Sequence, residues 1–213
     1  MIVPSDMIKI ECPFVRKEID GAYIVTPDIE PGYEWMFEDP TVLAIEKLHG
    51  TNVSVIIEDG TIKSVWNRTE RLPFFNKGKR HVIDGIQESY SRGYLDLPDG
   101  QWFGELIGPK VNGNPYQLDK HIWIPFSTYA REHLAYKSWG KYPKDFNTIS
   151  EWFKELQPLY WWKVHGQNEV NGKKPFAEGI VFTHPDGRMA KLRVDMMPWF
   201  TGQRHKEGEA DKQ

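Results

Sequence analysis

The sequence has one cysteine, Cys12, among 213 residues. A single thiol cannot close a disulfide within the chain or build a cysteine-based zinc site. No apolar run approaches the roughly 18 residues that a membrane span requires. Residues 1–14 lack a basic stretch followed by an apolar core, so no secretory signal is visible. These absences favour a cytoplasmic, intracellular protein without a membrane partner.

An excess of basic charge is also lacking, because the net charge is -3 and the isoelectric point is about 6.2. This excludes a globally basic nucleic-acid binder, so any contact with nucleic acid requires a local patch. One candidate patch is the segment 61–82, where the only acid beside the basic residues is Glu70. By charge alone, the segment fits a solvated face equally well. Its basic residues are Lys63, Arg68, Arg71, Lys77, Lys79 and Arg80.

The length favours one domain, and we find no internal repeat. We expect a single domain over residues 1–200 and a flexible polar tail over 201–213. Aromatic residues are abundant at 14%, including nine tryptophans. Four of them fall in the segment 127–177, where they either pack a helical subdomain or provide a binding surface. These four are Trp139, Trp152, Trp161 and Trp162.

The centre of the chain is rich in β-forming residues. Two apolar runs, 54–58 and 61–66, flank Asp59-Gly60, which is typical of a two-residue hairpin turn. Further strands are expected at 102–108, at 121–126, where Pro125 favours a sheet edge, and at 178–182 and 189–194. The segment 13–40, rich in proline, glycine and acids, is interpreted as loops with short strands.

Three segments are expected to be helical. Apolar residues recur at helical spacing over 81–92. Ser127 is a candidate cap for a helix over 128–138, and Thr148 with Glu151 forms a capping-box pattern that opens a helix through about Leu156. Strands and helices mix without a βαβ rhythm, which predicts an α+β fold with mostly antiparallel sheets flanked by helices.

The stretch EKLHGTN, residues 46–52, places Lys47 beside a glycine-containing turn between two apolar runs. Three later strands also carry charge among apolar residues, where an unpaired charge is costly. A lysine amine is a covalent nucleophile when deprotonated, cations can hold a phosphate, and carboxylates can hold Mg²⁺ or ribose. This set suits nucleotidyl transfer, although each charge could instead lie on a solvent face. The charges are Glu105, Glu178, Lys191 and Arg193.

Together, these motifs over residues 41–195 resemble the covalent nucleotidyltransferase superfamily of ATP-dependent ligases and capping enzymes. The stretch EKLHGTN is most similar to the nucleophile motif of the RNA ligase 2 family. The resemblance implies the nucleotidyltransferase (ligase adenylation domain) fold. It also implies ATP as substrate, Mg²⁺ or Mn²⁺ as cofactor, and RNA as partner.

The resemblance also implies a role for each matching residue. Lys47 would become adenylylated, and Glu46, His49 and Asn52 would shape the loop and contact the nucleotide. Arg68, with Arg71 as the alternative, would contact ribose or phosphate. Phe126, with Trp123 as the alternative, would stack on adenine. The remaining assignments are Glu105 to ribose, Glu178 and Glu105 to the metal, and Lys191 and Arg193 to phosphate.

Two features depart from the family pattern. The final Lys-x-Lys pair is Lys191 and Arg193 here, and arginine cannot donate a proton near neutral pH. Only 19 residues follow Val194 (213 minus 194), so we expect no separate C-terminal or OB domain. A partner that supplies an RNA-binding surface is therefore a further expectation.

The leading hypothesis is an ATP-dependent RNA ligase that joins a 3′-hydroxyl to a 5′-phosphate through a lysyl-AMP intermediate. One alternative within the superfamily is a DNA ligase or a capping-type nucleotidyltransferase. Another is a module that binds nucleotides or RNA ends without joining strands.

Overall fold

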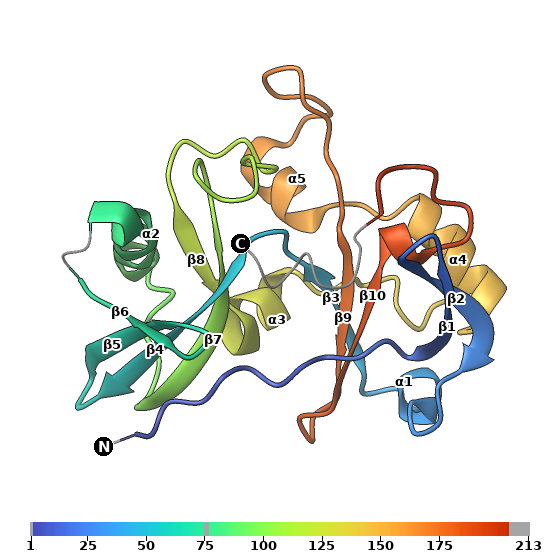
Figure 1. Ribbon diagram of the computed structural model, residues 1–213, viewed down its shortest axis with the longest axis horizontal. Helices are drawn as coiled ribbons and strands as arrows, with labels where there is room; N and C mark the ends of the chain where they lie inside the picture. The colour runs from blue at the N-terminus through green and yellow to red at the C-terminus, as the bar shows by residue number, and fades with distance from the viewer. Residues whose placement is uncertain (1, 75–76, 205–213) are drawn as a thin grey trace. The chain divides into compact units, whose positions relative to one another are not determined.

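The computed structural model describes residues 2–74 and 77–204, which form two compact units (Figure 1). Unit 1 comprises residues 2–9, 48–134 and 159–176, and unit 2 comprises residues 10–47, 135–158 and 177–204. The chain passes from unit 2 to unit 1 between Lys47 and Leu48, within the EKLHGTN stretch. The single domain over 1–200 stays a prediction, and most of the predicted tail, 201–213, lies outside the described residues.

Unit 2 is built on a three-stranded antiparallel sheet in the order β10 (Met189–Arg193), β9 (Gly179–Thr183) and β3 (Leu43–Lys47). Its core face is almost fully buried and carries Ala44, Phe182 and Leu192, with Glu46 as a buried charged residue. A hairpin of β1 (Phe14–Ile19) and β2 (Ala22–Ile29) forms a separate sheet. The helices of the unit are α1 (Glu34–Glu38), α4 (Phe146–Lys154) and the 3₁₀ turn η3 (Val194–Met196).

Unit 1 is built on a five-stranded antiparallel sheet in the order β6 (Glu70–Leu72), β5 (Thr61–Asn67), β4 (Thr51–Glu58), β7 (Gly100–Ile107) and β8 (Ile122–Pro125). Its buried core joins Val53, Leu106 and Trp123 of the sheet to Val82 and Ile86 of α2 (Arg80–Ser91). Its other helical segments are η1 (Lys77–Lys79), η2 (Phe126–Ala130), α3 (Arg131–His133) and α5 (Leu159–His165).

Most of the predicted elements are confirmed. The turn between β4 and β5 has positive φ at both Asp59 (54°) and Gly60 (64°), as a two-residue hairpin turn requires. The predicted helix at 81–92 is α2, and the two late strands are β9 and β10. Pro125 ends β8, the outermost strand of its sheet, where a missing backbone N–H is tolerated.

Two helix predictions need correction. The expected helix over 128–138 is a short π-helix followed by one α-helical turn that ends at His133, and Ser127 does not cap it. The helix does not continue to residue 138 because Ala135 forms a β-bridge with Ile45. The α4 helix begins earlier than predicted, because Asp145 caps it by accepting the Thr148 backbone N–H at 3.0 Å.

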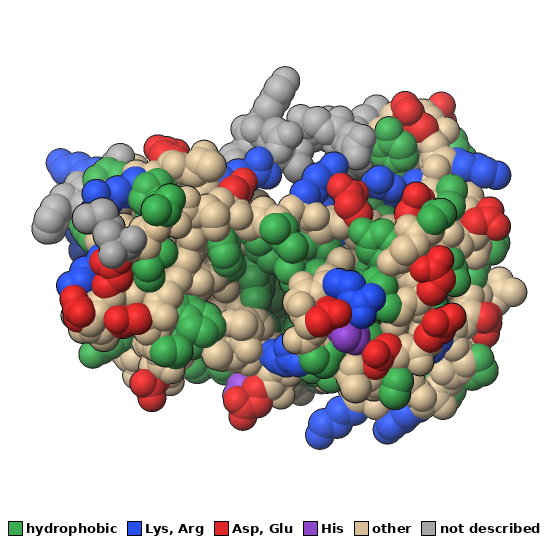
Figure 2. Space-filling view, turned by 90° about the horizontal axis from the view of Figure 1, so that it is seen from below, with side chains coloured by type: hydrophobic (Ala, Val, Ile, Leu, Met, Phe, Trp, Pro, Cys, Tyr) green, Lys and Arg blue, Asp and Glu red, His purple; other side chains and the backbone are tan. Residues whose placement is uncertain are grey.

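The segment interpreted as loops with short strands contains β1 and β2, of six and eight residues, and also the helix α1. The named strands all pair antiparallel, so the predicted α+β class with mostly antiparallel sheets is confirmed. Within the described ranges, no helix has the length and apolarity to cross a membrane. On the face seen in Figure 2, acidic and basic side chains are interspersed, in keeping with the small net charge.

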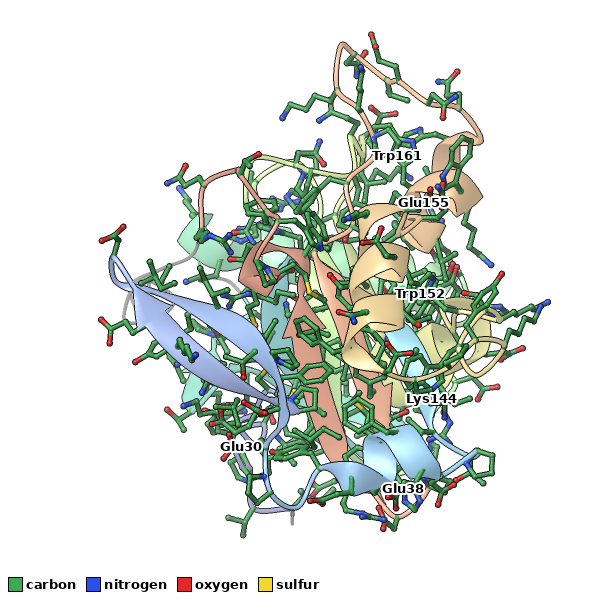
Figure 3. All side chains as sticks on the ribbon, turned by 90° about the vertical axis from the view of Figure 1, so that its right-hand side faces the viewer. Glu30, Glu38, Lys144, Trp152, Glu155 and Trp161 are labelled. Carbon is green, nitrogen blue, oxygen red and sulfur yellow. The ribbon has the colours of Figure 1, made fainter. Side chains whose placement is uncertain are left out.

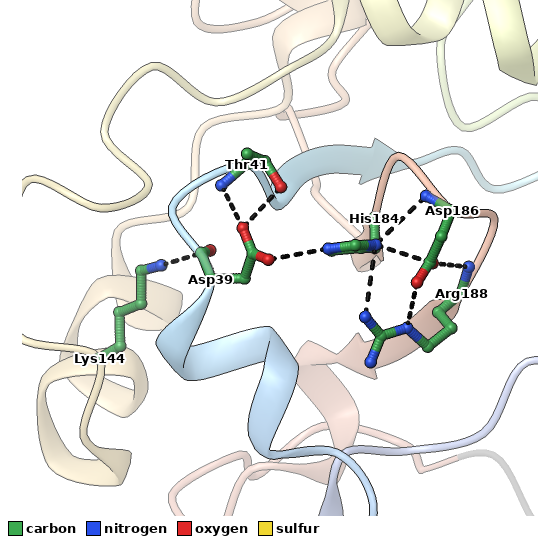
Figure 4. A network of polar contacts seen from close by, with 6 residues as sticks. All are labelled: Asp39, Thr41, Lys144, His184, Asp186 and Arg188. Atoms are coloured by element: carbon green, nitrogen blue, oxygen red, sulfur yellow. Dashed lines mark hydrogen bonds and ion pairs between the residues drawn. The ribbon is translucent and has the colours of Figure 1, made fainter.

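A polar network in unit 2 ties the β9–β10 turn to the segment before β3 (Figure 4). His184 Nε2 lies 2.9 Å from Asp39 Oδ2, and its Nδ1 lies 2.7 Å from Asp186 Oδ1. Asp39 Oδ1 also accepts hydrogen bonds from the backbone N–H and hydroxyl of Thr41. These bonds hold the pKa of Asp39 well below its usual range, and the bond to Asp39 raises the pKa of His184.

Candidate active site

Lys47, the last residue of β3, forms an ion pair with Glu178, which immediately precedes β9. The Nζ–Oε1 distance is 2.7 Å, and the side chains are 24% and 11% exposed. The pairing follows from the strand register, because Lys47 lies directly opposite Gly179. The structure therefore brings together the predicted nucleophile and the predicted metal-binding carboxylate, in a setting where solvent screens their attraction only partly.

Lys191 and Arg193 lie on the same face of this sheet as Lys47. Arg193 and Lys47 are both paired with Gly179, and Lys191 is paired with Val181, which in turn faces Ile45. Residues directly opposite each other in antiparallel strands share a face, and alternate residues along a strand do so too. The face consequently carries three cations, Lys47, Lys191 and Arg193, with Glu178 at its end.

Gly179 permits the close approach of the strands at the centre of this arrangement. A Cβ atom at this position would collide with the carbonyl oxygen of Leu192 and would lie 2.7 Å from the Cα of Arg193. Any larger residue would push β10 away from β9 and would disturb the spacing of the cations on this face.

Arg193 is held by a carboxylate that sequence reasoning did not single out. Its Nε lies 2.8 Å from Asp195 Oδ1, and its Nη2 donates to Asp195 Oδ2 at 3.3 Å. Asp195 is only 7% exposed. These two contacts fix the orientation of the Arg193 guanidinium, and the Asp195 carboxylate balances its charge. The Arg-x-Asp spacing at the end of a strand was a usable signal, since it allows a side-chain bond across two residues.

Glu46 does not share the face of Lys47. It alternates with Lys47 along β3, lies opposite Ile180 of β9, and is only 3% exposed. Its charge contributes to raising the pKa of Tyr136, for which burial is the main cause. A contact between Glu46 and a nucleotide stays a prediction, and the observed position is on the core side of the sheet.

In unit 1, the loop after Lys47 is shaped by hydrogen bonds to its backbone. Glu105 Oε1 accepts the Gly50 N–H at 3.0 Å, and the hydroxyl of Tyr116 accepts the His49 N–H at 2.9 Å. The Asn112 side chain donates to the Gly50 carbonyl at 2.9 Å. A Cβ at Gly50 would lie 2.7 Å from Glu105 Cγ, so only glycine permits this contact. The loop is thus held by groups that the motif itself does not reveal.

Asn52 and Glu105 are directly paired in the β4–β7 ladder, so they share one face of the five-stranded sheet. Asn52 Nδ2 lies 3.1 Å from the sulfur of Met7. The structure therefore brings these two predicted nucleotide contacts together in unit 1. Tyr116 and Asn112 were not predicted from the sequence. The asparagine-rich segment VNGN at 111–114 could have indicated an ordered loop here, because asparagine tolerates the positive φ that Asn112 and Asn114 adopt.

Two predicted roles in unit 1 had alternative residues, and the structure places the members of each pair in different surroundings. Arg71 pairs with Trp66, which lies opposite Ser54, and therefore shares the face of Asn52 and Glu105. Arg68 occupies the exposed turn between β5 and β6, with φ of 52°. Trp123 is fully buried and donates its indole N–H to Val53 at 2.9 Å. Because no ring can stack on a fully buried side chain, Phe126, which is half-buried, is the remaining choice.

A magnesium ion, as predicted, needs oxygen ligands from nearby side chains. In the part of the chain that the structure describes, no group of three or more His, Cys, Asp or Glu side chains could hold a metal ion. Mg²⁺, however, usually takes one or two protein carboxylates, substrate phosphates and water. Glu178 beside Lys47 fits that pattern, so a metal here would depend on a bound nucleotide to complete its ligands.

A sequence model described as RNA ligase matches residues 40–199. No curated protein matched the chain. Solved structures of the Naegleria gruberi RNA ligase are similar: two variants with ATP and Mn have TM-scores of 0.47 at 14% and 15% identity, covering 86% and 90% of this chain. The same ligase with PPi has a TM-score of 0.44 at 16% identity, covering 88%.

This chain matches 59% to 61% of the length of those solved chains, so it spans about three fifths of them. The family match covers most of the present sequence, and it contains Lys47, Glu105, Glu178, Lys191 and Arg193. The chain belongs to the RNA ligase family.

Proposed function

We propose that the chain is an ATP-dependent RNA ligase with the nucleotidyltransferase fold, and that Lys47 carries the AMP. The observation that supports this most is the face of the β3–β9–β10 sheet. It sets Lys47 within 2.7 Å of Glu178, and on the same side as Lys191 and Arg193. A reacting lysine needs a proton acceptor and phosphate-binding cations, and this face supplies both.

In the first step, Nζ of Lys47 attacks the α-phosphorus of ATP. A phosphoramidate bond forms, the bond to the bridging oxygen breaks, and pyrophosphate leaves. The amine must first lose its proton, and Glu178 Oε1 is in position to receive it. Lys191 and Arg193 add positive charge on the same face, which favours bound phosphate.

Glu178 would also hold Mg²⁺ or Mn²⁺, with Glu105 as the other predicted carboxylate. A divalent cation neutralises the charge that develops on the departing pyrophosphate. In unit 1, we propose that Glu105 binds the ribose, that Phe126 stacks on adenine, and that His49, Asn52 and Arg68 contact the nucleotide. Arg71, which shares the face of Asn52 and Glu105, is the alternative to Arg68. The solved Naegleria ligase variants contain ATP and Mn, which agrees with this choice of substrate and metal.

In the second step, AMP passes from Lys47 to the 5′-phosphate of RNA. In the third, the 3′-hydroxyl attacks that phosphate, a phosphodiester bond forms and AMP leaves. The membership in the RNA ligase family supports RNA as the polynucleotide. We also propose that the joining steps use a partner that supplies an RNA-binding surface.

The test is incubation of pyrophosphate-treated, nucleotide-free protein with α-labelled ATP and Mg²⁺, followed by denaturation. The wild type is expected to retain label, and Lys47→Arg, which keeps the charge, is expected to retain none. Lys63→Arg, at an exposed lysine of β5, is the matched control and should label normally.

A second candidate function has one observation in its favour. Arg193, one of the cations proposed to bind phosphate, is already paired with Asp195. A chain in which this pair never opens would bind a nucleotide or an RNA end without joining strands. Folded protein that binds ATP but takes no label would establish this binding module and overturn the ligase proposal.

A further inference from the structure

The segment 136–144, YKSWGKYPK, belongs to unit 2 and starts beside β3, an edge strand of its sheet. It begins at the bridge between Ala135 and Ile45, and Tyr136 donates its backbone N–H to Ala44 at 2.8 Å. At its other end, Nζ of Lys144 donates to the Asp39 carbonyl at 3.5 Å (Figure 4). The segment is therefore anchored at one end to β3, the strand that carries Lys47, and at the other end to the segment before β3.

The tryptophan of this segment, Trp139, packs against other aromatic rings of unit 2. Trp139 stacks on Trp152 of α4, with ring centroids 5.7 Å apart and an interplanar angle of 26°. Its ring also lies 4.8 Å from that of Phe182, a buried residue of β9. Figure 3 shows Trp152 on α4 with Lys144 close by on the connecting segment. These contacts give the segment a rigid aromatic base.

Three polar side chains of the segment are exposed at the surface. Tyr142 is 61% exposed, and Lys137 and Lys141 are exposed. Nζ of Lys144 lies 4.9 Å from the ring centroid of Trp139 and adds a third positive charge. The next acid in the sequence, Asp145, is engaged with Thr148 as the cap of α4.

An exposed ring flanked by cations on a rigid base is the arrangement that binds unpaired nucleotides. Bases of any sequence stack on aromatic rings, while lysines neutralise the phosphates. We propose that the segment 136–144 binds single-stranded RNA, with a base stacked on Tyr142 and phosphates contacted by Lys137 and Lys141. This inference rests on the proposed ligase function and assigns part of its RNA-binding surface.

The test measures the affinity of the full chain for a fluorescent single-stranded RNA and for a blunt RNA duplex of equal length. Stacking is worth about 1–3 kcal/mol per base, so Tyr142→Ala should weaken single-strand binding by about 5- to 150-fold. Tyr142→Phe, which keeps the ring, should bind as the wild type does. Duplex binding should not change in either variant, because paired bases cannot stack on the tyrosine.

The lysines are tested through salt dependence. Lys141→Glu should weaken single-strand binding and reduce the slope of log affinity against log salt by about 0.7, the value for one lost phosphate contact. Tyr90→Ala and Lys17→Glu are matched controls, because Tyr90 is 71% exposed and Lys17 is an exposed lysine of unit 2.

Equal losses in the variants and their controls, or unchanged binding in Tyr142→Ala and Lys141→Glu, would overturn the inference. Labelling by α-labelled ATP uses no RNA, so it reports separately on the proposed function. The segment variants should label as the wild type does. If the wild type binds RNA but takes no label, the ligase proposal fails and the RNA-binding segment stands.

Discussion

The two units hold the polar side chains of their sheets in different ways. In unit 2, charges pair with charges, as Lys47 does with Glu178 and Arg193 with Asp195. In unit 1, a carboxylate, Glu105, fixes the backbone of the nucleophile loop at Gly50. Ion pairs can exchange a protein partner for a phosphate or a metal ion, whereas a bond to a backbone N–H fixes shape. We infer that unit 2 carries the chemistry and that the groups of unit 1 set the geometry of the loop.

The largest expected effect comes from removing a phosphate-binding cation in unit 2. Lys191→Ala should slow the labelling of Lys47 by about 100- to 1000-fold, the usual cost of losing one preorganised charge-stabilising group. Single-turnover labelling measures the rate. Lys17→Ala, an exposed lysine of β1 in the same unit, is the control and should label at the wild-type rate. A normal rate in Lys191→Ala would assign the chemistry to other residues.

The pair between Arg193 and Asp195 tests how far unit 2 depends on ion pairing for stability. Arg193→Ala removes two hydrogen bonds from an aspartate that is 7% exposed. The free energy of unfolding should fall by about 2–3 kcal/mol, measured by urea denaturation. Arg193→Lys keeps the charge and should lose less. If both variants are as stable as the wild type, the pair contributes nothing to the fold.

Substituting one glycine in each unit by alanine compares the two units directly. Gly179→Ala places a Cβ against β10 in unit 2, and Gly50→Ala places one against Glu105 in unit 1. Each should lower the free energy of unfolding by about 1–3 kcal/mol, as overpacking does. We expect Gly179→Ala to slow labelling more, because it displaces the strand of Lys191 and Arg193. Equal rates in the two variants would contradict the division of roles between the units.

The smallest expected effect is a dependence of stability on pH that arises in unit 2. The pKa of His184 is raised above its ordinary value by its bond to Asp39. The stabilisation is therefore fully present below pH 6.5, the ordinary value, and is lost as pH rises through the higher folded value. Thermal melts from pH 6 to 9 should show a gradual loss of stability, and His184→Gln should flatten it. An unchanged slope in that variant would place the titration elsewhere.

The sequence predicted the strands and the paired charges better than it predicted the supporting contacts. Runs of apolar, β-forming residues located β4, β9 and β10, because such residues pack well in buried strands. The helix expected over 128–138 was wrong because its residues favour a helix locally, but Ala135 bonds to a distant strand. Propensity does not record such a tertiary partner.

The same reasoning explains which site residues could be found. Lys47, Glu178 and Lys191 are charges within apolar segments, and the cost of burying them made them visible in the sequence. Asp195 bonds to Arg193 two residues before it, so the Arg-x-Asp spacing was a signal that could have been used. Tyr116 bonds to His49, which is far away in the sequence, so only the fold reveals this contact. Glu46 was chosen for its place in the motif, but strand alternation puts it on the opposite face from Lys47.

The central claim is that Lys47 itself carries AMP. The most direct measurement treats the protein with pyrophosphate, incubates it with ATP and Mg²⁺, digests it, and locates AMP by peptide mass spectrometry. We expect the modification on Lys47, within the peptide that contains EKLHGTN, and its reversal by pyrophosphate. AMP on another residue, or none on folded protein that binds ATP, would contradict the proposal.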